Sequence, residues 1–198
     1  LITIENNNIN GYNLNLVGYY WPSDTNLPII VRGNIFSNLN YLTRRAISLT
    51  NSKHPIKIYN NTFLNNTGNI DFLAIYDKTG IISNVEIYNN TFYNPSPSCM
   101  TSACIGIWFY MKNGTLSNIS IYNNSLRGFN SGILLHAGLE SDYTTKNIKI
   151  YDNNIYNNYA GIGEYENPVN SGGIDVYNNN IFNNLVGIFL PTNNNQPS

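Results

Sequence analysis

The chain has 198 residues, 11% of them charged, and its formal net charge at neutral pH is -1. Ordinary soluble domains carry about 25% charged residues, whereas here 40 asparagines and 16 tyrosines supply much of the polarity. No basic run could follow a phosphate backbone, so nucleic acid is excluded as an expected partner. No apolar stretch reaches the roughly 20 residues of a bilayer span, and no leader pattern opens the sequence. We therefore expect no membrane span, and a signal peptide that has already been removed.

Seven copies of one pattern follow each other along the chain. The clearest copy, residues 56–65, reads Ile-Lys-Ile-Tyr-Asn-Asn-Thr-Phe-Leu-Asn. Apolar residues alternate with other residues on either side of the Asn-Asn pair, which predicts two very short strands joined by a turn. The copies begin at Ile2, Ile29, Ile56, Val85, Ile119, Ile148 and Ile174. The third residue of each copy recurs after 27, 27, 29, 34, 29 and 26 residues, which predicts loops of variable length between fixed strands.

A third short strand is expected after each copy from the second onward. The predicted third strands are residues 46–49, 74–77, 106–109, 132–135, 161–164 and 187–190. Three strands per turn of about 27 residues, without helical periodicity, predict an all-β fold, the right-handed parallel β-helix, a three-sided solenoid of about seven coils. We assign residues 1–190 to this single domain and residues 191–198 to a C-terminal tail.

The second asparagine of the turn is present in every copy, and we predict that these side chains stack inside the solenoid as an asparagine ladder. Stacked amides can hydrogen-bond from coil to coil, and Asn tolerates the left-handed backbone of a sharp corner. The predicted ladder comprises Asn7, Asn34, Asn61, Asn90, Asn124, Asn153 and Asn179. A second, partial ladder is predicted at Asn38, Asn65, Asn94, Asn157 and Asn183, interrupted by Gly11 and Gly128.

Cys99 and Cys104 lie in a run rich in Pro and Ser, within the longest spacing between copies. We predict a local disulfide that pins an inserted loop, and two free thiols are the alternative. Two cysteines are too few for a tetrahedral metal site, and no metal or other cofactor is expected. Six Asn-X-Ser/Thr sequons are candidate glycosylation sites, although asparagine enrichment alone could also produce them. They begin at Asn60, Asn65, Asn89, Asn113, Asn118 and Asn123.

The first strand of each copy presents regular outward positions. One of them carries tyrosine in five consecutive copies, which predicts a tyrosine ladder at Tyr59, Tyr88, Tyr122, Tyr151 and Tyr177. The position between the two isoleucines carries charges, so Lys57 is expected to face Glu86 and Lys149 to face Asp175. Such exposed pairs are worth at most about 1 kcal/mol each.

The third strands predict an exposed aromatic stripe, interpreted as a surface for carbohydrate or for a protein partner. It comprises Tyr76, Trp108, Tyr110, His136, Tyr165 and Phe189. Two alternatives are coverage by a long loop, such as residues 138–147, and stacking that only stiffens the sheet.

The two motifs Ile-x-Ile-x-Asn-Asn-x-Ile and Gly-Ile-x-Leu resemble the right-handed parallel β-helix repeat family, which includes pectate lyases, polygalacturonases, phage tailspikes and NosD-like proteins. The resemblance runs from Ile2 to Leu190 and implies architecture rather than activity. Enzymes of this family use clustered Asp residues with Arg, Lys or His, and the polygalacturonase signatures are absent here. The best acidic grouping is Glu164 with Glu140 or Asp142, near His136, and we interpret it as solvated loop rather than active site.

We therefore assign no catalytic residue and predict a non-enzymatic extracellular or cell-surface module with a structural or adhesive role. Its expected partners are further copies of itself, stacked head to tail into filaments, or a cell-surface glycan. The alternative is a carbohydrate-active β-helix enzyme, a polysaccharide lyase or glycoside hydrolase, or a carbohydrate-binding remnant of one.

Overall fold

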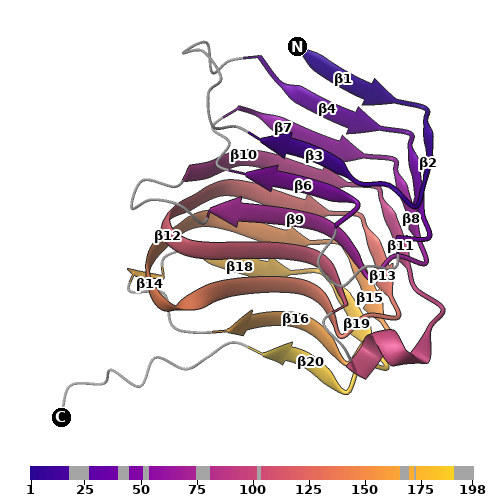
Figure 1. Ribbon diagram of the computed structural model, residues 1–198. Coiled ribbons are helices and arrows are strands. Elements are labelled where there is room, and N and C mark those ends of the chain that lie inside the picture. Colours follow the sequence, from indigo (N-terminus) through magenta and orange to yellow (C-terminus); the bar gives the residue numbers. More distant parts are fainter. Residues whose placement is uncertain are drawn as a thin grey trace.

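The computed structural model describes residues 1–17, 27–39, 45–50, 54–74, 81–101, 104–165, 170–171 and 173–189. The chain winds into stacked coils whose strands form three faces, and every strand pairing is parallel (Figure 1). Seven strands form the second face, which agrees with seven coils. The predicted all-β parallel β-helix is confirmed.

The three faces are built from successive strands of each coil. The first face contains β1 (Ile2–Glu5), β4 (Ile29–Arg32), β7 (Ile56–Tyr59), β10 (Ile81–Tyr88), the C-terminal parts of β12 (Ile105–Tyr122) and β14 (Ser131–Tyr151), and β18 (Ile174–Tyr177). The second face contains β2 (Asn8–Asn10), β5 (Ile35–Ser37), β8 (Thr62–Leu64), β11 (Thr91–Tyr93), β13 (Ser125–Arg127), β15 (Asn154–Tyr156) and β19 (Asn180–Phe182). The third face contains β3 (Leu14–Val17), β6 (Ile47–Thr50), β9 (Gly68–Ala74), the N-terminal parts of β12 and β14, β16 (Ala160–Tyr165) and β20 (Val186–Phe189).

The core is filled by the inward side chains of the three faces. On the first face, Val31, Ile58 and Ile87 are fully buried, and on the second face Phe63 stacks between Phe36 and Phe92. The ring centroids of these phenylalanines are 5.0 and 4.6 Å apart, which is the spacing of neighbouring strands. The inward residue of one coil therefore packs directly on the same residue of the next.

The first corner, between the first and second faces, contains the predicted asparagine ladder, which is confirmed. Along the row, the backbone N–H and the Nδ2 group of each asparagine both donate to Oδ1 of the asparagine one coil later, over 2.9–3.1 Å. The Nδ2 groups of the buried members also donate to main-chain carbonyls, as Asn61 does to Val31 and Tyr59. The left-handed conformation, however, belongs to the residue before the ladder: Asn6, Gly33, Asn60, Asn89, Asn123, Asp152 and Asn178.

At the second corner, between the second and third faces, a left-handed residue again precedes the residue that enters the interior. Asn38, Asn65, Asn157 and Asn183 take left-handed φ values of 54–58°. In four coils the next residue is buried: Leu39, Asn66, Phe129 and Asn158. The predicted second ladder is shown in part, because Asn65 donates to Asn38 over 3.0 Å and Asn94 is itself buried. In the third and sixth coils the buried asparagine is one residue later than predicted, because both members of an Asn-Asn pair fit the repeat equally well.

The third corner departs most from the sequence prediction. β12 and β14 continue from the third face onto the first face through left-handed Asn118 and Asn147. Residues 142–147 of the predicted loop therefore lie in a paired strand, whereas residues 138–141 fall at a register shift between β12 and β14. In the third coil, β9 is the third strand, so the predicted strand at residues 74–77 was placed too late.

Among the described residues, no helix has the length and apolar character needed to cross a membrane. The short β17 (Asn170–Ser171) pairs with β14. Among the described residues, one 3-10 helix is present, η1 (Pro97–Thr101), in the insertion between β11 and β12. This insertion leaves the solenoid at the second corner, beside β11 and β13 (Figure 1).

Candidate functional site

The outward side of the first face is occupied by the predicted tyrosine ladder. Neighbouring tyrosine rings lie 4.8–5.0 Å apart with interplanar angles of 2–7°. At one end, Nη1 of Arg32 donates to the hydroxyl of Tyr59 over 3.1 Å, and Arg32 also forms an ion pair with Glu5. Because the rings stack face to face, they present edges and hydroxyl groups rather than ring faces.

Packing changes the ionisation of this ladder. Burial raises the pKa of Tyr122 to about 12, and burial also raises the pKa values of Tyr88 and Tyr151. These phenols stay neutral well above neutral pH, since the charged form would lose hydration. Beside the ladder, a hydrogen bond to Glu86 raises the pKa of Lys57.

The two predicted ion pairs lie in the expected register. The ammonium nitrogen of Lys57 lies 3.0 Å from a carboxylate oxygen of Glu86. Lys149 lies opposite Asp175 in the pairing of β14 with β18. The Lys57–Glu86 ion pair is therefore formed, and Lys149 and Asp175 occupy facing positions.

The predicted aromatic stripe on the third face is brought together only in part. Trp108, Leu134, Gly163 and Phe189 follow one another in register, as do Tyr110, His136 and Tyr165. The position beside Trp108 in the preceding coil is held by Asp71, and Tyr76 lies outside the described residues.

The ring of Trp108 is already engaged by the protein. The guanidinium carbon of Arg45 lies 4.9 Å from the ring centroid, and Arg45 is 7% exposed. Tyr110 meets the same ring edge-on at 5.4 Å, and Leu134 is buried. Phe189, by contrast, is 45% exposed. The stripe is therefore half-buried around Trp108 and exposed toward the last coil.

The acidic residues of the predicted grouping lie apart along the strands. Glu164 lies opposite Leu135 on the third face, whereas Asp142 lies opposite Asn113 near the third corner. Among the described residues, no three His, Cys, Asp or Glu side chains gather as a metal site would require.

Five of the six sequon asparagines lie at corners with left-handed φ values. Asn60, Asn89 and Asn123 are exposed at the first corner, Asn65 is half-buried at the second, and Asn118 is exposed at the third. The sixth, Asn113, lies within β12. The five at corners leave the strands of the faces free of their side chains.

A different surface emerges on the second face, where the last residue of each strand points outward. In consecutive coils these residues are Leu64, Tyr93, Arg127, Tyr156 and Phe182, which we call the second-face stripe. The guanidinium carbon of Arg127 lies 3.9 Å from the ring centroid of Tyr93 and 6.0 Å from that of Tyr156. The rings of Tyr156 and Phe182 then stack at 4.9 Å. The stripe is a continuous column of half-exposed side chains.

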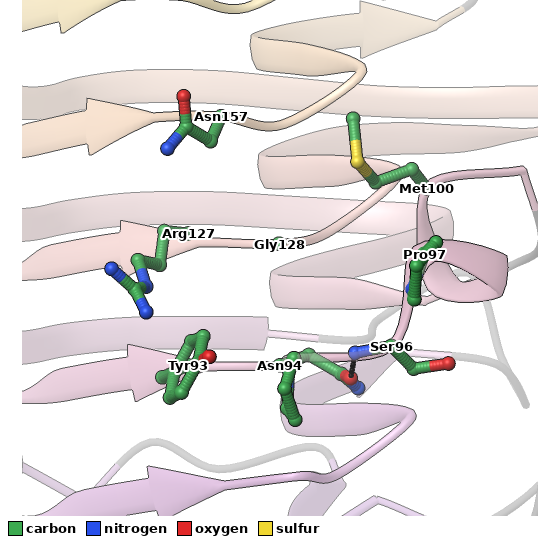
Figure 2. A pocket seen from close by; sticks show the side chains of 9 residues that line it. Tyr93, Asn94, Ser96, Pro97, Met100, Arg127, Gly128 and Asn157 are labelled. Atoms are coloured by element: carbon green, nitrogen blue, oxygen red, sulfur yellow. Dashed lines mark hydrogen bonds between the residues drawn. The ribbon is translucent and has the colours of Figure 1, made fainter.

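A groove of about 280 Å³ lies beside this stripe. Figure 2 shows Tyr93 and Arg127 on one side of Gly128, Pro97 and Met100 from the insertion on the other, and Asn157 on the next coil. Asn94, Pro95 and Ser96 complete the lining. The groove thus joins a cation, apolar side chains and amide groups in one concave surface.

The insertion is tied to the solenoid by several bonds. A disulfide joins Cys99 and Cys104, both of which are buried. Asn94 donates from Nδ2 to the sulfur of Cys99 over 3.1 Å and accepts at Oδ1 from the backbone of Ser96 over 2.9 Å. Asn130 donates to the carbonyl of Met100. The wall of the groove is therefore held in place from both of its ends.

Gly128 allows the backbone of β13 to pass close to the start of the insertion at Asn94. Its φ is +86°, and a Cβ atom there would lie 1.9 Å from the carbonyl oxygen of Asn94. Any side chain would collide with the backbone of the insertion. The interruption of the asparagine row at this position is thus a requirement of the groove.

Comparison with known proteins gives no relative: no family model, no curated protein and no solved structure matches the chain. The chain is a parallel β-solenoid, and its site has to be interpreted from its own residues.

The sequence analysis missed this groove. Its stripe residues differ from coil to coil, so a search for repeated residues passes over them. Each coil has one strand on the second face. Aligning the last residue of that strand from coil to coil would have placed Tyr93, Arg127, Tyr156 and Phe182 in one column.

Proposed function

We propose that the chain is a non-enzymatic structural and adhesive module of an extracellular or cell-surface protein. The supporting observation is that ladders parallel to the solenoid axis hold successive coils together: buried amides at the first corner and stacked phenol rings on the first face. Such ladders stiffen a solenoid, since each coil contacts mainly its neighbours. The buried disulfide fits an oxidising compartment.

Head-to-tail self-assembly into filaments is part of this proposal. The asparagine ladder is directional, because donors of one coil always meet the acceptor of the following coil. A directional ladder can continue only into a copy of the same orientation, which gives a heterologous contact and an open filament. Low net charge opposes such contact only weakly.

The test is electron microscopy of the purified chain over a range of concentrations. Ile188, in the core row of the last described coil, is 46% exposed, and Ile35, on the second face, is 44% exposed. We expect filaments that Ile188→Lys shortens or abolishes and Ile35→Lys leaves intact. A chain that stays monomeric at high concentration would contradict self-assembly.

A carbohydrate-active solenoid, akin to pectate lyases or to NosD-like proteins, is the second candidate. It is favoured by one acidic position on the third face, Asp71, which is in register with Trp108. Glu164 is in register with the buried Leu135 and therefore occupies an inward position. Incubation with a panel of neutral and acidic polysaccharides, followed by measurement of new reducing ends and unsaturated products, tests it. Cleavage by the wild type that is lost in Asp71→Asn would replace the structural proposal with this one.

A further inference from the structure

The second face carries a single charge. Its seven described strands have three residues each, and Arg127 is the one charged residue among them. Elsewhere, Arg32 and Lys57 each meet a carboxylate on the neighbouring coil. The nine residues that line the groove beside Arg127 include no carboxylate. The guanidinium therefore lacks an acidic counterpart within its own groove.

We propose that the groove beside Arg127 docks an extended peptide of a partner protein, which presents a carboxylate side chain and, two residues away, an apolar one. The carboxylate pairs with Arg127, and the apolar side chain packs on Pro97 and Met100. This inference names the partner of the adhesive role proposed above, and it rests on that role.

Charge complementarity selects the carboxylate. A guanidinium binds carboxylates through two parallel N–H···O bonds, and such charge-assisted bonds are about twice as strong as neutral ones. The stack on Tyr93 fixes the plane of the Arg127 guanidinium, so less conformational freedom is lost on binding. The stack on Tyr93 thus preorganises the Arg127 guanidinium to bind a carboxylate.

The composition of the surface favours protein over sugar. Sugar rings pack on free aromatic faces, but Arg127 covers a face of Tyr93, and Phe182 covers a face of Tyr156. Tyr, Arg and Met are enriched at protein interfaces, and Tyr and Arg are frequent among their strongest contacts.

The dimensions fit a short extended segment. The second-face stripe spans five coils, which is about 19 Å at the spacing of neighbouring strands, and about six extended residues cover that length. The groove volume of about 280 Å³ has room for a side chain or two. Alternate side chains of the peptide would enter the groove while the others face solvent.

Selection from a displayed library of random dodecapeptides tests the proposal. The intact, disulfide-bonded chain is immobilised at low density, so that self-assembly does not contribute to the result. We expect the wild type to enrich peptides with Asp or Glu two residues away from an apolar residue. The matched control is Arg32→Met, which removes an arginine from the first face and should enrich the same peptides.

Three variants of the groove give the decisive results. Arg127→Met should weaken binding of a selected peptide about tenfold or more, because a charge-assisted bond is lost. Arg127→Glu should shift the selected peptides from acidic to basic. Met100→Glu leaves the stack of Arg127 on Tyr93 intact and should weaken binding to a similar degree. Circular dichroism and thermal melting establish that each variant is folded.

Several outcomes overturn the proposal: no enrichment on the wild type, the same enrichment on Arg127→Met, or Arg127-dependent binding of acidic oligosaccharides with no peptide selected. Failure here leaves the filament and polysaccharide experiments untouched, since those read assembly and cleavage. Conversely, polysaccharide cleavage would remove the structural proposal without altering the outcome of peptide selection.

Discussion

The first and second corners both turn the chain from one face to the next, but their interior side chains differ in how uniform they are. At the first corner, all seven coils place an asparagine in the interior row, and each one bonds to the next. At the second corner the corresponding positions hold Leu39, Asn66, Phe129, Asn158 and Asn184, whereas Tyr12 and Pro95 at this position are exposed. The disulfide-bonded insertion and the groove beside it lie at the second corner.

The difference teaches where such a solenoid can vary. An unbroken amide ladder makes every member a partner of two others, so a change at one coil leaves buried polar groups unpaired in its neighbours. In a row that already mixes amides with apolar side chains, the backbone N–H and C=O groups find their hydrogen-bond partners in several ways. Such a row can therefore accept inserted residues, and the inserted residues can form a binding surface.

The largest expected effect breaks the uniform corner. Asn90 accepts two hydrogen bonds from Asn61 and donates to Asn124, Ile58 and Tyr88. Asn90→Leu should lower the free energy of unfolding by about 3–5 kcal/mol, because several buried groups lose their partners together. Urea unfolding followed by circular dichroism measures this change.

Asn66→Leu is the matched change at the second corner. The side chain of Asn66 makes fewer bonds, to the backbone of Leu39 and of Phe36, and leucine already occupies this row at Leu39. We expect a loss of about 1–3 kcal/mol. Equal losses in Asn90→Leu and Asn66→Leu would refute the distinction between the corners.

Removing the disulfide sharpens the comparison from the other side. Replacing Cys99 and Cys104 together with Ala should lower the free energy of unfolding by about 2 kcal/mol, since the closed loop is short. Alkylation of native protein without reductant, followed by mass spectrometry, should find no free thiol. Two modified cysteines would show that the insertion is held without a covalent bond.

High pH should weaken the first face. The pKa of Tyr122 is raised to about 12 in the folded chain, whereas an unfolded tyrosine titrates near 10. The unfolded state therefore loses its proton first, so this contribution to stability is intact below pH 10 and is lost as the pH rises toward 12. Urea unfolding at pH 9 and pH 11.5 should show a smaller pH-dependent loss in Tyr122→Phe than in wild type; identical losses would contradict this assignment.

The smallest effect is expected at the Lys57–Glu86 pair. Both side chains are about 40% exposed, so a double-mutant cycle with Lys57→Met and Glu86→Gln should give a coupling of about 0.2–1 kcal/mol that decreases with added salt. A coupling above 2 kcal/mol would mean that the first face depends on charge more than on its stacked rings.

The sequence predicted the regular parts of the fold well. Asn61, Asn90 and Asn124 recur with the same neighbours, so period and register followed together for the first corner and the first face. The second corner was misplaced by one residue in the third and sixth coils, because Asn65 and Asn66 have the same side chain and only backbone conformation separates their roles. The third strand of the third coil was placed too late because residues 74–77 resemble the repeat more closely than Asn69-Ile70-Asp71-Phe72 does.

The groove could not be predicted from the repeat, for a physical reason. Its wall comes from a disulfide-bonded insertion, and the position of this insertion depends on the close approach of Gly128 to the backbone of Asn94. Repetition reveals what the coils share, whereas Arg127 and Met100 line one groove through a feature outside the repeat.

The equivalence of the ladder bonds has a consequence for how proteins of this design change in length. Asn34 bonds to Asn61 through the same atoms by which Asn61 bonds to Asn90. One whole coil could be removed or duplicated and the interrupted bonds would find identical partners, whereas a change of half a coil would leave a face without its strand. The axial length of such a rod is therefore quantised, in steps of about 4.8 Å.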